Sequence, residues 1–505
     1  MRVARGCAAQ AAALFSVGAV LARPLAAQCP DGSPPPCRVA QADPGRQPEV
    51  APNSVAVLYF DNLSSDSAYA YLADGLTEEV IVRLGQVRRL RVKSRNEVRR
   101  FRGTGRSDSR AMGRTLGVAY LVTGSIRPAG NRLRVTAELV RAVTGQTVWT
   151  DVFDRRSDDV LAINAEIAVA LATAIAGRLL PGDRASLTRW PTREPAAYDL
   201  YLRGRFFFSR FTEPDIRRAI DLYAQALARD SSFALALTAT AHAWNTLADD
   251  WLPPREAYAN ARAAAERAIA LDSNADALVA LALPRLLLDR DPSGAEGLTR
   301  RALELEPGIP QGLVTAMMIA SMHGRSYEAV NAMARLWELD TLSYHGAFFY
   351  AEVLAQNRRF TALAEFVHRV GDVMPPAEAR GWEGVARFGS GDCAGAVPLL
   401  RQSTEIHFRM DLGAALVCAG RRDEARALLD STVAEASRRY VNAYFIAALH
   451  VALGDYDAAF AWLDRADEER TGYLAYLPTD FRWDPIRSDP RFAALLARLG
   501  LGGER

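Results

Sequence analysis

Few residues of this chain have the type and spacing that catalysis requires. The six histidines lie more than 20 residues apart, so a metal site or a catalytic triad would have to be assembled by folding. Solvated or buried structural histidines are the simpler interpretation of His242, His323, His345, His368, His407 and His450.

The motifs that mark common catalytic sites are also missing. The sequence contains no GxxxxGK[ST] phosphate loop, no HExxH and no GxSxG. Asp61, Asp66 and Asp74 could form an acidic cluster, but turn and capping roles explain them without a metal. The sequence therefore predicts no enzyme, no cofactor and no metal.

One segment is strongly basic. Residues 83–114 hold 12 Arg or Lys against Glu97 and Asp108. A solvated face is the favoured interpretation, and the functional alternative is that the segment binds an anionic membrane surface, through its phosphate groups, or an acidic protein. Nucleic acid is not expected as a partner, because the net charge of the whole chain is only +2 and Phe101 is the one aromatic in the segment. The candidate surface residues are Arg88, Arg89, Arg91, Lys93, Arg95, Arg99, Arg100 and Arg102.

The amino terminus reads as an export signal. Two arginines precede an apolar, Ala-rich run, and small residues end at Ala27, so we expect cleavage after residues 1–27 and a location in the periplasm or envelope of a bacterium. Retention as a membrane anchor is the alternative. The mature chain shows no other candidate transmembrane span.

Residues 28–53 are expected to be a linker in which Cys29 and Cys37 form a local disulfide. Cys393 and Cys418 are compatible with a bridge or with two buried thiols.

Residues 54–180 alternate between strand and helix patterns. Strands are predicted at 54–60, 90–94, 119–127, 132–139 and 146–153, and helices at 74–84, near 94–97 and at 158–180. This order predicts an α+β domain. The runs SVAVLYFDNLSSDSAYAYLADGLTEEVIVRL and LGVAYLVTGSIRPAGNRLRVTAELVRAVTGQTVWTDVFDR resemble the TolB-like amino-terminal domain. That resemblance implies a binding or assembly role and no catalytic residue.

Residues 195–468 repeat with a period of 34. Ala261, Ala295 and Ala329 share this spacing, and a Gly precedes an Ala by five residues at Gly324/Ala329, Gly391/Ala396, Gly420/Ala425 and Gly454/Ala459. Small side chains at this period indicate antiparallel helix pairs stacked closely, so we predict seven to eight tetratricopeptide repeats in an all-α superhelical solenoid. Residues 470–505 are expected to cap its last apolar surface.

In tetratricopeptide proteins, the first helix of each repeat lines a concave groove for peptides. With the turn glycines as reference, we expect an apolar, Met-rich groove suited to an adaptable hydrophobic segment. Packing between helices is the alternative role for these side chains. The residues are Gln311, Val314, Met318, Ser321, Met322, Val385, Phe388, His407, Met410, Val417, Tyr444 and Val451.

These patterns favour a non-enzymatic scaffold that binds a protein or peptide partner. Two alternatives remain from the sequence: an accessory subunit of an envelope signalling enzyme of the kinase or nucleotide-cyclase type, and a peripheral membrane binder acting through residues 83–114.

Overall fold

The computed structural model describes residues 50–501, apart from residues 65, 67–68, 100, 103–107, 157–158, 342 and 404. The predicted signal, the Cys29–Cys37 loop and Arg100 lie outside the described residues.

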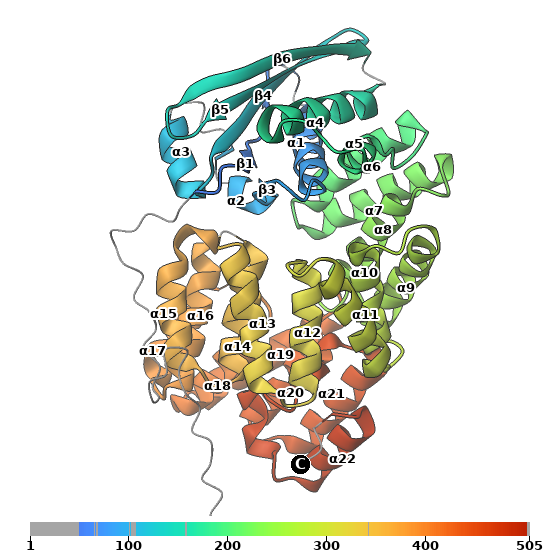
Figure 1. Ribbon diagram of the computed structural model, residues 1–505. Coiled ribbons are helices and arrows are strands. Elements are labelled where there is room, and N and C mark those ends of the chain that lie inside the picture. The colour runs from blue at the N-terminus through green and yellow to red at the C-terminus, as the bar shows by residue number, and fades with distance from the viewer. Residues whose placement is uncertain are drawn as a thin grey trace, which may run out of the picture. The chain divides into compact units, whose positions relative to one another are not determined.

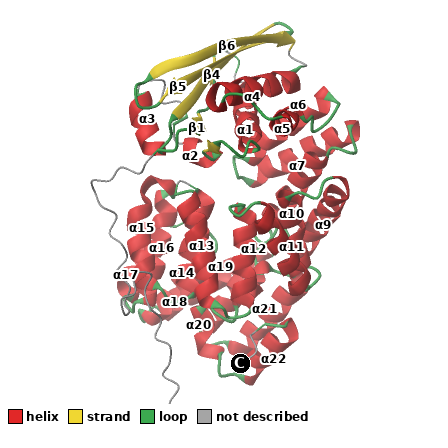
Figure 2. Cartoon of the chain, viewed as in Figure 1, coloured by secondary structure: helices red, strands yellow, loops and turns green. Residues whose placement is uncertain are grey.

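The first domain is built on one mixed sheet (Figure 2). The strand order is β3-β1-β4-β5-β6, and β2 also pairs with β4. Strand β1 runs parallel to β3 and β4, whereas β4, β5 and β6 form an antiparallel meander, so the predicted α+β class is confirmed. The strands are β1 (Ser54–Val57), β2 (Asp61–Asn62), β3 (Arg91–Val92), β4 (Tyr120–Ala129), β5 (Arg132–Arg141) and β6 (Gln146–Arg156).

Helices cover both faces of the β1 region, which explains why every residue of β1 is buried. Helices α1 (Ala70–Gly85) and α4 (Val160–Ala176) share one apolar cluster with the strands. The short helices α2 (Arg95–Arg99) and α3 (Ser109–Leu116) contribute to a second cluster with Ala56 and Leu121. A further helix, α5 (Pro181–Thr188), follows α4.

Helix α1 differs from the prediction in a way that matters for its acidic residues. It begins at Ala70, one turn before the predicted start at Asp74. Asp74 and Glu78 are therefore interior helix positions, where they are buried and pair with Arg102 and Arg95, and do not serve the helix dipole.

The rest of the chain consists of eight consecutive helix pairs within the described residues (Figure 1). This arrangement confirms the predicted solenoid of tetratricopeptide-type repeats. The pairs are α6 (Pro195–Phe208) with α7 (Glu213–Arg229), α8 (Ala234–Leu247) with α9 (Pro254–Leu271), α10 (Ala275–Leu287) with α11 (Pro292–Leu305), α12 (Pro310–Met322) with α13 (Ser326–Leu339), α14 (Tyr344–Gln356) with α15 (Phe360–Val370), α16 (Pro376–Gly389) with α17 (Cys393–Leu400), α18 (Phe408–Cys418) with α19 (Arg422–Ala436), and α20 (Ala443–Ala452) with α21 (Tyr456–Glu469).

The repeat signature has a direct structural cause. Ala261, Ala295 and Ala329 are each 0% exposed, because neighbouring helices pack so closely that only a methyl side chain fits between them. The turn glycines occupy the left-handed region that a side chain disfavours, as at Gly454, where φ is 72°. Between α15 and α16 lies one turn of 3-10 helix, η2 (Gly371–Val373).

Helix α6 joins the solenoid to the first domain through α1. Tyr71 of α1 donates a hydrogen bond to Asp199 of α6 at 2.6 Å, and Arg205 of α6 pairs with Glu78 of α1 at 2.7 Å. A single apolar cluster contains residues of both helices. The two domains thus share a packed joint.

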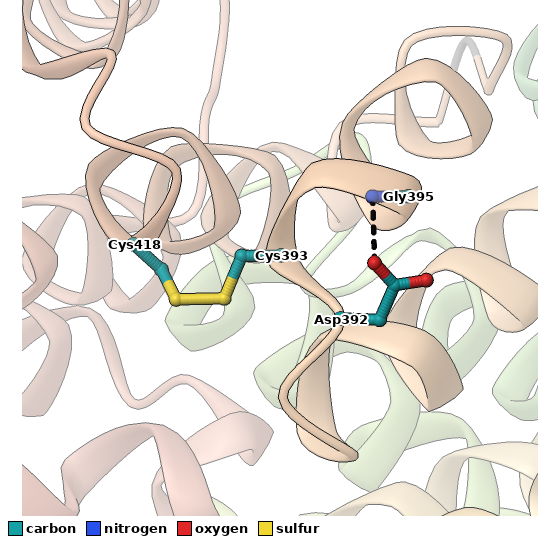
Figure 3. The surroundings of a disulfide bond; sticks show 4 residues. All are labelled: Asp392, Cys393, Gly395 and Cys418. Atoms are coloured by element: carbon teal, nitrogen blue, oxygen red, sulfur yellow. Dashed lines mark hydrogen bonds between the residues drawn. A yellow bond between two sulfur atoms is a disulfide. The ribbon is translucent and has the colours of Figure 1, made fainter.

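A disulfide links Cys393 and Cys418 (Figure 3). The sequence alone was compatible either with this bridge or with two buried thiols. Their Cα atoms lie 5.8 Å apart, at the start of α17 and the end of α18. Helix α17 is only 8 residues long, and the side chain of Asp392 caps it by accepting from the Gly395 N–H at 2.9 Å. The bridge therefore ties the shortest repeat helix to its successor.

The chain ends in three short elements: η3 (Gly472–Tyr476), η4 (Phe481–Ile486) and α22 (Pro490–Leu499).

We predict that Ala261→Leu destabilises the protein, whereas Ala263→Leu does not. Both residues lie on α9, but Ala261 is fully buried and Ala263 is exposed. Overfilling the helix contact should lower the free energy of unfolding by about 1–3 kcal/mol. Urea unfolding of the two variants measures this difference, and equal losses would contradict the packing argument.

We also predict that Cys393→Ser with Cys418→Ser lowers stability by roughly 3 kcal/mol, because the bridge closes a loop with a sequence separation of 25. Thermal unfolding with and without reductant provides the measurement. Reductant should lower the melting temperature of the wild type and leave that of the double variant unchanged.

Candidate functional site

The twelve predicted groove residues lie on α12, α16, α18 and α20, with His407 immediately before α18. Seven of them are buried against other parts of the same chain, and Gln311 alone of the twelve is exposed. Those seven, inaccessible to a peptide in this arrangement, are Met318, Ser321, Met322, Val385, Met410, Tyr444 and Val451. The half-buried residues are Val314, Phe388, His407 and Val417.

The chain's own C-terminal segment, residues 471–501, covers much of this surface. Element η3 contacts α12, and η4 contacts α14 and α20. The ring of Phe481 packs against Phe360 at 5.1 Å and against Phe388 at 6.1 Å between centroids. The segment thus shields inner repeat helices in addition to the last apolar surface.

A buried polar network fixes the centre of this segment. Two nitrogens of Arg482 donate to the two carboxylate oxygens of Asp411, each at 2.8 Å, and a third donates to Asp480 at 3.1 Å. Tyr444 donates to Asp480, and the Trp483 indole donates to Tyr444, both at 2.7 Å. Burial alone would lower the pKa of Arg482, but the charges of Asp411 and Asp480 outweigh it and raise that pKa. Such a network is stable only when every partner is present.

Asp249, in the turn between α8 and α9, anchors the start of the segment. Its carboxylate accepts from the Tyr258 hydroxyl at 2.8 Å, from the Gly472 N–H at 3.0 Å and from the Asn442 amide at 3.2 Å, as well as from the Thr471 hydroxyl. Residues more than 190 positions apart thereby meet at one carboxylate.

Beside the covered region lies a group of carboxylates and aromatic rings in which Asp250 and Glu405 are exposed, the rings are half-buried and Glu378 is buried. We call it the acidic–aromatic site and define it as Asp250, Trp251, Tyr344, Phe348, Glu378 and Glu405. Two of these residues come from the α8–α9 turn, two from α14, one from α16 and one from the segment before α18.

Ring contacts and a hydrogen bond connect four of the members, namely Trp251, Tyr344, Phe348 and Glu378. Tyr344 donates to Glu378 at 2.7 Å. The Phe348 ring lies 6.4 Å from that of Tyr344. Trp251 is connected to α14 through Phe211. The centroid of the Phe211 ring lies 6.4 Å from that of Trp251 and 4.3 Å from that of His345.

The carboxylates influence one another electrostatically. Desolvation by the surrounding protein, and then the charges of Asp249 and Glu405, raise the pKa of Asp250, although its side chain keeps contact with solvent. Burial, and to a lesser degree the charge of Glu405, also raises the pKa of Glu378 to about 7, against the hydrogen bond from Tyr344. The charges of Glu378, Glu405 and Asp250 all act on the Tyr344 hydroxyl, whose pKa burial raises. The charge of Glu405 thus acts on Asp250, on Glu378 and on Tyr344.

Burial lowers the pKa of His407 to about 3, so its ring is neutral near pH 7. The ring packs against Phe348 at 5.5 Å and against Trp382 at 6.0 Å. Of the predicted groove residues, His407 is thus the one in ring contact with the acidic–aromatic site. The site's own members lie up to 155 positions apart and carry no shared sequence motif, which is why sequence reasoning missed them.

Many cations of the basic segment are engaged inside the first domain. Arg89 pairs with Asp183 and Lys93 with Glu97, in addition to the Arg95 and Arg102 pairs with α1. Arg88 and Arg91 are exposed. Nothing is described of the Arg99 side chain. The segment thus supplies internal ion pairs as well as an exposed face.

Among the described residues, no three His, Cys, Asp or Glu side chains are grouped so that they could hold a metal ion. Within the same residues, no helix is both long and apolar enough to cross a membrane.

Comparisons with known proteins show similarity to part of one curated protein. The chain is 33% identical over 223 residues to a protein of Rhizobium meliloti (strain 1021) named "Putative adenylate cyclase 3". The match covers 43% of this chain and 38% of that protein, so this chain spans well under half of its relative's length. No family model matches the chain.

Solved structures with some similarity are tetratricopeptide proteins. YrrB, described as having an unusual peptide-binding site, is 20% identical with a TM-score of 0.25, covering 38% of this chain and 91% of its own. A tetratricopeptide repeat protein of Parabacteroides merdae is 12% identical with a TM-score of 0.36, and the match covers 52% of this chain and 99% of that protein. Yeast Tom70 is 12% identical with a TM-score of 0.39, and the match covers 67% of this chain and 82% of that protein. At these low scores, the fold assignment rests on the helix pairs of this chain itself.

We predict that stability falls as pH rises from about 5 to about 8, and that Glu352→Gln flattens this dependence. Burial raises the pKa of Glu352, on α14, to about 8 from its ordinary 4.5. In this range the folded chain keeps a proton that the unfolded chain has lost, so each pH unit costs up to about 1.4 kcal/mol.

Urea unfolding at several pH values measures this slope. Glu365→Gln, at an exposed position on α15, is the matched control and should retain the wild-type slope. Identical slopes in wild type and Glu352→Gln would contradict the prediction.

Proposed function

We propose that this protein is a non-enzymatic scaffold whose solenoid binds a peptide or protein segment at the acidic–aromatic site. The observation that carries this proposal is the contrast between two neighbouring surfaces. The apolar, Met-rich surface is covered by the C-terminal segment, whereas the acidic–aromatic site keeps half-buried rings and the exposed carboxylates of Asp250 and Glu405 accessible. Accessible aromatic rings on stacked helices are a common basis for peptide recognition.

We further propose that the protein acts in the envelope of a bacterium. The signal-like amino terminus and the Cys393–Cys418 bridge both support this proposal, since disulfides persist in oxidising compartments. The TolB-like resemblance of the first domain supports a docking role there. The many internal ion pairs of the basic segment favour this role over membrane binding, because engaged cations contribute less to an anionic surface.

A regulatory or accessory role in nucleotide-cyclase signalling is the second candidate. It is favoured by the 33% identity to part of a protein named as an adenylate cyclase. In this case the solenoid would still act by binding, and the catalytic partner would be a separate module. Formation of cyclic AMP from ATP by the purified chain alone would contradict the non-enzymatic proposal.

The proposal predicts a partner whose capture depends on Tyr344. The full chain is immobilised and incubated with envelope extract, in parallel with Tyr344→Ala and with Tyr327→Ala. Tyr327 is the matched control, because it is 76% exposed on α13, outside the site. Mass spectrometry should identify a protein retained by wild type and Tyr327→Ala and at least tenfold depleted with Tyr344→Ala. Retention of no protein, or of the same proteins by all three, would overturn the proposal.

A further inference from the structure

A small cavity lies between the first helices of the third and fourth repeats and the C-terminal segment. It has a volume of about 40 Å³, and its walls are mostly apolar, with Leu287 of α10, Met322 of α12 and Leu474 of η3 among them. Two arginines, Arg290 and Arg470, also line it. Their side chains are 35% and 21% exposed, so the charged side of the cavity borders solvent.

Both arginines are held in a backbone conformation that side chains disfavour. The angle φ is 55° at Arg290, between α10 and α11, and 64° at Arg470, which caps the end of α21. The described part of the chain contains five non-glycine residues with positive φ, and two of them line this one cavity. Backbone strain of this kind persists where the surrounding structure holds a side chain in a required position, as ligand sites often do.

The positive charge at the cavity is only partly neutralised. Among the described residues, Asp467 is the one carboxylate that pairs with Arg290 and with Arg470, the latter at 3.7 Å. The same carboxylate also pairs with Arg498, at 3.4 Å. Burial, followed by the charge of Arg255, lowers the pKa of Arg470 below its ordinary value, as expected for a cation without full compensation.

The guanidinium of Arg470 also carries donors without acceptors. Its Nε and Nη1 atoms are buried and donate no hydrogen bond, and no other arginine in the described part of the chain has two such nitrogens. Buried donors without acceptors are costly. A water molecule would accept from them but leave the excess charge, whereas a carboxylate would satisfy the donors and neutralise the charge together.

We propose that this cavity binds a short-chain monocarboxylate, similar in size to acetate or propionate. The carboxylate accepts from Arg290 and Arg470, because guanidinium and carboxylate groups match in charge and in planar geometry. The alkyl group contacts the leucine and methionine side chains of the walls, which sulfate or phosphate would leave without an apolar partner. This cavity shares no residue with the acidic–aromatic site, so the inference does not depend on the proposed peptide binding.

Isothermal titration calorimetry of the full chain with sodium propionate, at constant ionic strength maintained with chloride, tests this inference. Saturable binding of propionate is expected, and neutral propionamide should bind at least tenfold more weakly because it lacks the charge. Arg470→Gln should also weaken propionate binding at least tenfold. Arg301→Gln is the matched control, because it removes an exposed charge that pairs with Glu304 on α11, and it should bind as wild type does.

Circular dichroism checks that each variant is folded, and Arg290→Gln replaces Arg470→Gln if the latter does not fold. Absence of saturable binding of acetate, propionate and butyrate, or equal affinities of the wild type and the folded cavity variant for propionate, would overturn the inference. Equal affinity for sulfate and propionate would do so as well, since the apolar walls would then contribute nothing. None of these outcomes affects the capture of a partner through Tyr344, so the two proposals can fail separately.

Discussion

The structure depends on close contact between helices that carry small side chains where they meet. Each helix pair leaves an apolar face that it cannot bury alone, so the pair is stable only against a neighbour. Buried alanines such as Ala295 and Ala329 set the short distance between helices, and glycines with positive φ permit the tight turns. Everything described at the candidate site follows from this stacking, because it places the first helices of successive repeats next to one another.

Stacking creates a second requirement, since the surface along the first helices is itself apolar. The C-terminal segment meets it on α12, α14 and α20 with Leu474, Phe481 and Trp483. The segment is held by two buried polar centres, at Asp249 and at Arg482, each of which joins residues from several repeats. Apolar contacts and buried hydrogen bonds thus act together to hold the C-terminal segment in place. The surface that stays accessible beside the segment carries Asp250 and Glu405.

This division explains how a single solenoid can carry two kinds of surface. Where the inner residues are apolar, the chain covers them itself and gains stability. Where they are Asp250 and Glu405, which are exposed, coverage by an apolar segment would leave charges buried and unpaired, which is unfavourable.

The repeats, their turns and the α+β order of the first domain could all be predicted from patterns along the chain. These features depend on local periodicity and on small residues at fixed spacing, which are written along the chain. The folded structure was needed to show that Trp483 covers Tyr444, that Cys393 meets Cys418, and that Tyr344 donates to Glu378. Those contacts join residues of different repeats, and the curvature that brings them together comes from the sum of many helix contacts, which no local pattern records.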